Sequence, residues 1–174
     1  MSASLQNIYK LGYKEATTPD SYADQMLGVE YTFEDADLLS SAAIKPLRSA
    51  SRVHAIWVQN THASTTFAPG SLVKYAIPRR TVNAQAGATE IVDGVVDPYL
   101  TAGPAPGERF FIIVKGPIPV LSNGSFSANA GLASSSSGKA ASATTGTVTN
   151  FGRAIEAAGG ADLLRRAYVD CRTF

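Results

Sequence analysis

One segment of this sequence comes within one residue of a nucleotide-binding motif. A P-loop reads Gly or Ala, four free positions, Gly-Lys and then Ser or Thr, and it cradles phosphate groups. The segment ASSSSGKA, residues 133–140, matches until its last position, where Ala140 lacks the hydroxyl that holds magnesium. A P-loop also needs a hydrophobic strand before it and a helix after it, and neither NGSFSANAGL nor ASATTGTVTN predicts one. We therefore expect no nucleotide and no cofactor here.

Two other interpretations of this region remain open. Between residues 127 and 150, almost every residue is Ser, Ala, Gly or Thr. Such a composition is typical of a flexible linker. It also suits strands and turns of very small residues inside a tight barrel, where bulky side chains do not fit.

Other residues with catalytic potential are few. His54 and His62 are the only histidines, and an enzyme interpretation would use one of them with an acid, as in a small β-barrel hydrolase. Asp93 and Asp97 flank GVV and could meet as a carboxylate pair, but Asp-Gly and Asp-Pro are more typical of turns. We predict that the chain is not an enzyme and has no catalytic site, no metal site and no small-molecule substrate.

The amino-acid composition excludes further classes of binding partner. The 174 residues are 45% hydrophobic and 17% charged, with a net charge of +1 and scattered Lys and Arg. This balance predicts a globular chain that binds neither nucleic acid nor a membrane. A single cysteine, Cys171, and no recognisable secretory signal favour a reducing compartment such as the cytoplasm.

The elements that must position any site are predicted to be strands. VHAIWVQN (residues 53–60) alternates, with Val53, Ala55 and Trp57 on one face and Ile56 and Val58 on the other. Further strands are expected over residues 71–77, 90–96, 109–115 and 163–171. Gly116-Pro117 is expected to break the strand over residues 109–115, and Pro119 to mark a sheet edge or a strand end. The fold class is therefore mainly β, with a body that forms a small sandwich or barrel.

The first fifty residues differ from the rest. Residues 1–50 are predicted to be an extended N-terminal arm with at most one short helix, and residues 51–174 to be the β-rich body. The arm holds four of the seven tyrosines. Because tyrosine supplies contact area at low entropic cost, we predict that the arm contacts a partner or a neighbouring subunit. The predicted partner-binding residues are Tyr9, Tyr13, Tyr22, Tyr31 and Phe33. The alternative is that the arm adds strands to the sheet of its own body.

Three stretches in order carry a resemblance to a known family. VVDPYLTAG, RFFIIVKGPIPVL and GTVTNFGRAIEA, the last followed by RAYVDC, together resemble the capsid decoration (cement) proteins of tailed bacteriophages. The resemblance covers residues 52–174 and rests on the order and spacing of the stretches, since no one motif is specific.

The resemblance implies a structural virion protein. Such a protein is made in the host cytoplasm, binds the outer surface of the assembled capsid as a homotrimer, and stabilises it by bridging subunits of the major capsid protein. A second hypothesis is a virion surface module that recognises a receptor or a carbohydrate through the Ser/Gly/Thr-rich loop. That module would place aromatic side chains beside the loop, and Phe126 is the one candidate.

Overall fold

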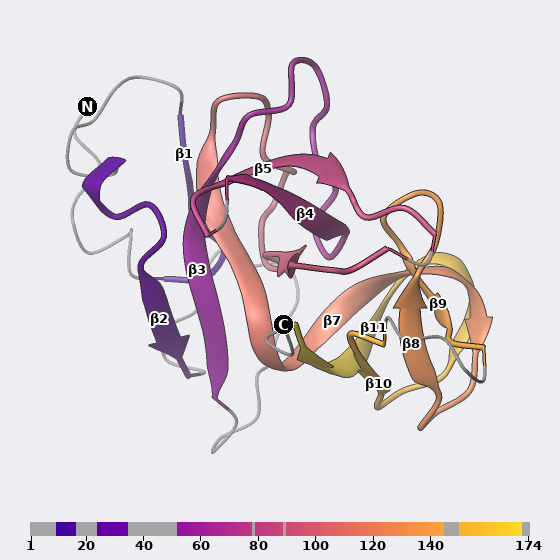
Figure 1. The fold of residues 1–174 in the computed structure, drawn as a ribbon. Helices are drawn as coiled ribbons and strands as arrows, with labels where there is room; N and C mark the ends of the chain where they lie inside the picture. The colour runs from indigo at the N-terminus through magenta and orange to yellow at the C-terminus, as the bar shows by residue number, and fades with distance from the viewer. Residues whose placement is uncertain are drawn as a thin grey trace.

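The computed structural model describes residues 10–16, 24–34, 52–77, 79–88, 90–144 and 150–171. These residues form a mainly β fold with almost no helix, as predicted (Figure 1). In the part of the chain that the structure describes, no helix is long and apolar enough to cross a membrane. The strands are β1 (Lys14–Glu15), β2 (Glu30–Phe33), β3 (Val53–Asn60), β4 (Leu72–Ile77), β5 (Thr81–Gln85), β6 (Gly94–Val96), β7 (Arg109–Phe126), β8 (Gly131–Ser134), β9 (Ala140–Ser142), β10 (Gly152–Ala154) and β11 (Ala158–Asp170).

The longest strand, β7, belongs to two rings of strands at once. Its first half, residues 109–115, pairs with β3 and β6, and the pairings β6–β4, β4–β5 and β5–β3 close the first ring. Its second half pairs with β11 and β9, and β11–β10, β10–β8 and β8–β9 close the second ring. We call these rings the first and second lobes; in Figure 1 β7 runs from one to the other.

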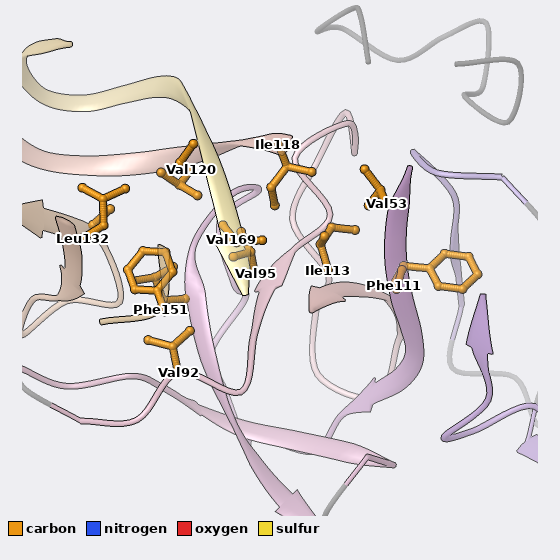
Figure 2. Packing of buried hydrophobic residues seen from close by; sticks show 14 of the residues in the cluster. Val53, Val92, Val95, Phe111, Ile113, Ile118, Val120, Leu132, Phe151 and Val169 are labelled. Carbon is orange, nitrogen blue, oxygen red and sulfur yellow. The ribbon is translucent and has the colours of Figure 1, made fainter. Parts of the chain in front are cut away.

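Both faces of β3 and of the first half of β7 are buried. Val53, Ala55 and Trp57 lie on one face of β3 and Ile56 and Val58 on the other, as predicted. One face points into the first lobe, where Ile56, Val58, Phe110 and Ile112 share a hydrophobic cluster with residues of β4, β5 and β6. The other face joins a larger cluster that extends into the second lobe. Figure 2 shows part of it, with Val120, Leu132 and Phe151 at one end, Val53 and Phe111 at the other, and Ile113 and Ile118 between them.

The prediction that β7 would break at Gly116-Pro117 is wrong, because the strand continues to Phe126. The N–H of Leu121 donates to the Gly70 carbonyl, on the side of β7 opposite β11. Alternate residues of a strand direct their N–H groups to the same side. Pro117 and Pro119 therefore lack N–H groups that would point to this same side, away from β11. On this side, no described strand pairs with β7 between Ile113 and Ser122, so no strand hydrogen bond is lost.

Gly116 permits the change of partner along β7. Its φ of 121° lies in the region that favours glycine, and β3 begins beside it, at Val53. A Cβ built at this position would lie 2.5 Å from the Arg52 carbonyl oxygen and 3.0 Å from the Val53 Cα. Both neighbours are backbone atoms, so they cannot rotate away as a side chain would.

We expect Gly116→Ala to lower the free energy of unfolding by at least about 2 kcal/mol, because a strained φ and a backbone clash add. The matched control is Gly124→Ala in the same strand, where a Cβ meets nothing within 4 Å. We expect that control to leave stability unchanged or slightly higher. Urea unfolding of both variants measures the difference, and equal losses would contradict this role for Gly116.

Candidate functional site

The structure places the described residues of the arm against the body. β1 pairs with the start of β7, and β2 pairs with β3, so the arm adds two strands to the sheet. This is the alternative to a free clamp, and it holds for residues 10–16 and 24–34. Tyr9 and Tyr22 lie outside the described residues, and their role as partner contacts stays a prediction.

An aromatic cluster forms where the arm meets the body. Tyr13 stacks on Trp57, with ring centroids 6.2 Å apart. Phe33 and Tyr31 both contact Phe111 edge-on, with centroid separations of 4.9 Å and 5.5 Å. Phe33 is buried in the core, while Tyr13 and Tyr31 are half-buried and pack against it. These three aromatic side chains therefore stabilise the chain's own fold, and their contact with a partner stays a prediction.

Two ion pairs also hold the arm. Arg109, at the start of β7, is nearly fully buried, and its Nη2 and Nε lie 2.6 Å and 2.8 Å from the Asp24 Oδ1. The Lys14 Nζ lies 2.6 Å from the Glu108 Oε2 and donates to the Gly103 carbonyl. A buried arginine that lost its carboxylate would be costly, so the Asp24 contact specifies where the arm lies.

Asp97, at the end of β6, receives the arm's backbone. Its side chain is fully buried, and its Oδ2 accepts the Gly12 N–H at 2.6 Å while its Oδ1 accepts the Tyr99 N–H at 2.9 Å. Burial raises the pKa of the Asp97 carboxyl from 3.8 to about 7, although the two hydrogen bonds oppose the rise. Asp97 thus anchors the backbone rather than forming a carboxylate pair with Asp93, whose Oδ2 accepts the Tyr75 N–H.

The two histidines are also placed by local structure. The His62 Nδ1 accepts the N–H groups of Ser64 and Thr65, so this ring caps a turn. The His54 Nδ1 lies 3.2 Å from the Glu30 Oε1 and 3.3 Å from the Thr32 Oγ1. A base that activates a hydroxyl needs the acid and the hydroxyl on opposite ring nitrogens, whereas here both face Nδ1. This arrangement does not provide a nucleophile and its base.

The P-loop-like segment folds as an antiparallel hairpin. β8 and β9 pair through Ala133 and Ala141, so no helix follows residue 138, and the Lys139 Nζ forms an ion pair with Asp162 at 2.7 Å. Ala133 and Ala140 are both buried, and Ala140 belongs to the hydrophobic cluster that extends into the second lobe. Strands and turns of small residues in a tight barrel are therefore the correct interpretation for residues 127–144. Phe126 is 4% exposed, so it does not stand beside the loop as a recognition surface.

Further comparisons add no assignment. Within the described ranges, no group of three or more His, Cys, Asp and Glu side chains is arranged to hold a metal ion. A scan against protein-family models and a search of curated protein sequences both found no match.

The sequence analysis missed the anchoring roles of two buried side chains, Asp97 and Arg109. Their position could have indicated these roles, because each charged residue lies directly beside a predicted buried strand.

We expect Phe33→Ala to reduce the free energy of unfolding by about 3 kcal/mol or more, because it leaves a cavity against Phe111. The control is Thr32→Ala, which alters the neighbouring exposed side chain and should change stability by less than about 0.5 kcal/mol. Chemical unfolding monitored by the fluorescence of Trp57 measures both. If Phe33→Ala unfolds like Thr32→Ala, β2 is not part of the folded core.

Asp97 predicts a particular pH dependence of stability. Its pKa rises from 3.8 in the unfolded chain to about 7 in the fold, so between these values the folded state holds a proton that the unfolded state releases. The contribution of Asp97 to the free energy of unfolding therefore falls as pH rises through this window and is level above it.

The measurement is urea unfolding of the wild type and Asp97→Asn at pH 5, 6, 7 and 8. The difference between them should change steadily from pH 5 to 7 and little above 7, because asparagine does not titrate. The absolute stability of the variant is not the readout, since asparagine replaces one of the two accepting oxygens with an NH2 group. Parallel pH profiles would contradict the raised pKa.

Proposed function

We propose that this chain is a capsid decoration protein that binds the outer surface of an assembled phage shell and bridges subunits of the major capsid protein. The observation that carries the proposal is where the family-like stretches lie. VVDPYL supplies part of β6, RFFIIVKGPIPVL begins β7, and GRA and RAYVD supply β10 and part of β11. Those strands are hydrogen-bonded neighbours, β6 to β7, β7 to β11 and β11 to β10. The resemblance thus falls on one contiguous part of the fold, across both lobes.

The mechanism is mass action on the shell. A protein that binds the assembled lattice but not free coat subunits stabilises the lattice, by about 2.7 kcal/mol per site at a concentration of 100 times Kd. A homotrimer would engage several coat subunits at once, and this linkage increases avidity without new contacts. No cofactor and no chemical step are required. The protein would act in the virion, after synthesis in the host cytoplasm.

The fold changes which residues are best suited to contact the shell. The described arm is engaged with its own body, and several small residues of β8 and β9 (Ala133, Ser134 and Ala140) are buried within the chain. The homotrimer is therefore supported by the resemblance rather than by small residues at an axis. Shell contacts then come from arm residues outside the described ranges, including Tyr9 and Tyr22, or from the exposed surface of the body.

Co-sedimentation tests the proposal directly. Expanded empty shells assembled from the major capsid protein of the same genome are mixed with the purified chain and pelleted. We expect saturable binding and a higher melting temperature of the decorated shells, with no binding to free coat subunits. A glycan array on the same sample tests the recognition module. Failure to bind shells, with or without glycan binding, would overturn the decoration function.

A further inference from the structure

The exposed large hydrophobic side chains are not spread evenly over the described residues. Val29 and Ile77 are 41% and 56% exposed, and Ile155 and Tyr168 are 46% and 45% exposed. Val29 directly precedes β2, and Ile77 is the last residue of β4. Ile155 directly follows β10, and Tyr168 lies in β11. In Figure 1, β2 lies on the left of the molecule, and β10 and β11 on the right. Each pair has two arginines beside it.

The first patch consists of Val29, Ile77, Arg79 and Arg80. Gly28 brings the arm to the β4–β5 turn, since a Cβ built on it would lie 3.2 Å from the Arg79 carbonyl oxygen and 3.5 Å from the Arg80 Cγ. The turn is held by the bond from the Arg80 N–H to the Ile77 carbonyl, and the Arg80 carbonyl accepts the Gln59 N–H. Arg79 adopts a φ of 62° in this turn. The exposed Ile77 is therefore presented on a fixed backbone.

The second patch consists of Arg153, Ile155, Arg166 and Tyr168, on the outer face of the second lobe. Arg153 and Tyr168 are register partners in the β10–β11 pair, so they lie side by side. The Ile155 N–H donates to the Arg166 carbonyl, which places the second apolar residue beside the second arginine. The Arg153 Nε donates to the Asn129 carbonyl, so this side chain is held along the sheet.

Each patch carries an excess of positive charge. In the first patch Arg79 pairs with Glu30 at 3.2 Å, and in the second the Arg166 Nε lies 4.0 Å from Glu156. Across the described ranges, no carboxylate lies within ion-pair distance of Arg80 or Arg153. Both patches thus combine two arginines, one carboxylate and two exposed apolar side chains.

Arginines beside exposed apolar side chains favour a protein surface as the partner. Arginine and tyrosine are enriched among residues that dominate binding energy, and a guanidinium binds a carboxylate through two parallel hydrogen bonds. Aliphatic side chains such as Val29 and Ile77 form no favourable contact with the phosphate backbone of a nucleic acid, but they can fill an apolar depression on a protein. The matching surface therefore presents Asp or Glu side chains around an apolar centre.

We propose that the two patches are paired docking sites for the same carboxylate-bearing surface on two neighbouring coat subunits. This inference rests on the proposed function. Identical subunits of a lattice repeat the same surface at a fixed spacing, so a bridging protein needs two similar sites on a rigid body. The two lobes share β7, which holds the patches at a fixed separation, and binding through both makes the second contact intramolecular.

The test uses charge-reversed variants of the full chain in the shell co-sedimentation assay. The first-patch variant is Ile77→Ser with Arg80→Glu, and the second-patch variant is Arg153→Glu with Tyr168→Ser. The matched control is Ile91→Ser, which removes an isoleucine that is 44% exposed and adjoins Glu90 rather than an arginine. All changed side chains are exposed or at the surface, and thermal melts confirm that each variant is folded.

We expect each patch variant to lose on the order of 10²-fold or more in apparent affinity for shells, because one contact cannot supply the avidity of two. The combined variant should not sediment with shells, and the control should bind within about twofold of the wild type. The loss should be smaller at high salt, where the arginine contacts of the wild type are already screened.

The possible outcomes distinguish failure of the paired patches from failure of the proposed decoration function. A wild type that does not bind shells overturns the proposed function. A wild type that binds, with both patch variants within about twofold of it, overturns the paired patches and leaves the function standing. Loss in only one variant overturns the pairing. Tight binding of the wild type to a short DNA duplex, lost in both variants, would overturn the choice of a protein partner.

Discussion

The whole fold depends on β7 remaining one continuous strand through Gly116. The strand serves as a wall of the first lobe over residues 109–115 and as a wall of the second lobe beyond Gly116. At the junction it exchanges β3 for β11, and the chain of β3 passes so close that only a hydrogen atom fits at the α-carbon of Gly116. The prolines that follow add stiffness without loss of hydrogen bonds, because their missing N–H groups face a side of β7 on which no described strand pairs at that point. Two small rings thereby become a single rigid body.

The arm completes that body rather than trailing from it. The outer face of β3 and β7 presents Trp57 and Phe111, which would be exposed if residues 10–16 and 24–34 were removed. The polar anchors, Asp97 for Gly12 and Arg109 for Asp24, sit beside this face and have their partners in the arm. A buried carboxyl and a buried guanidinium are costly when unpaired, so the docked position is specified by polar contacts and stabilised by apolar ones.

The sequence predicted the long strands well and the connections between them poorly. Alternation, β-branched residues and one unbroken apolar run located β3, the start of β7 and the end of β11. The pattern is strongest in β3 and at the start of β7, where both faces are buried. Strands of two or three residues such as β1 and β10 are too short to show a periodic pattern. The break expected at Gly116-Pro117 was wrong because a sequence does not say which side of a strand faces a partner. Pro119 does lie where, among the described strands, one side of β7 has no partner. The tyrosines correctly indicated residues that make contacts. Tyr13 and Tyr31 contact Trp57 and Phe111 of the same chain, and residues so distant in the sequence give no sign that they will meet.

A rigid body of this kind suits the proposed role for an energetic reason. Association costs free energy for every segment that must become ordered, so a clamp made of a free arm would lose part of its contact energy to entropy. Here most of the described charged side chains are already engaged within the chain, as in Lys14–Glu108, Lys115–Asp170 and Lys139–Asp162. Arg80 and Arg153 differ from them, since each stands beside exposed apolar side chains. The backbone of Arg80 is held by hydrogen bonds to Ile77 and Gln59, and the side chain of Arg153 by the Asn129 carbonyl. A partner that meets Arg153 finds that side chain already held. The folded body, with the described arm docked on it, is therefore a better candidate than a free arm for holding neighbouring subunits together.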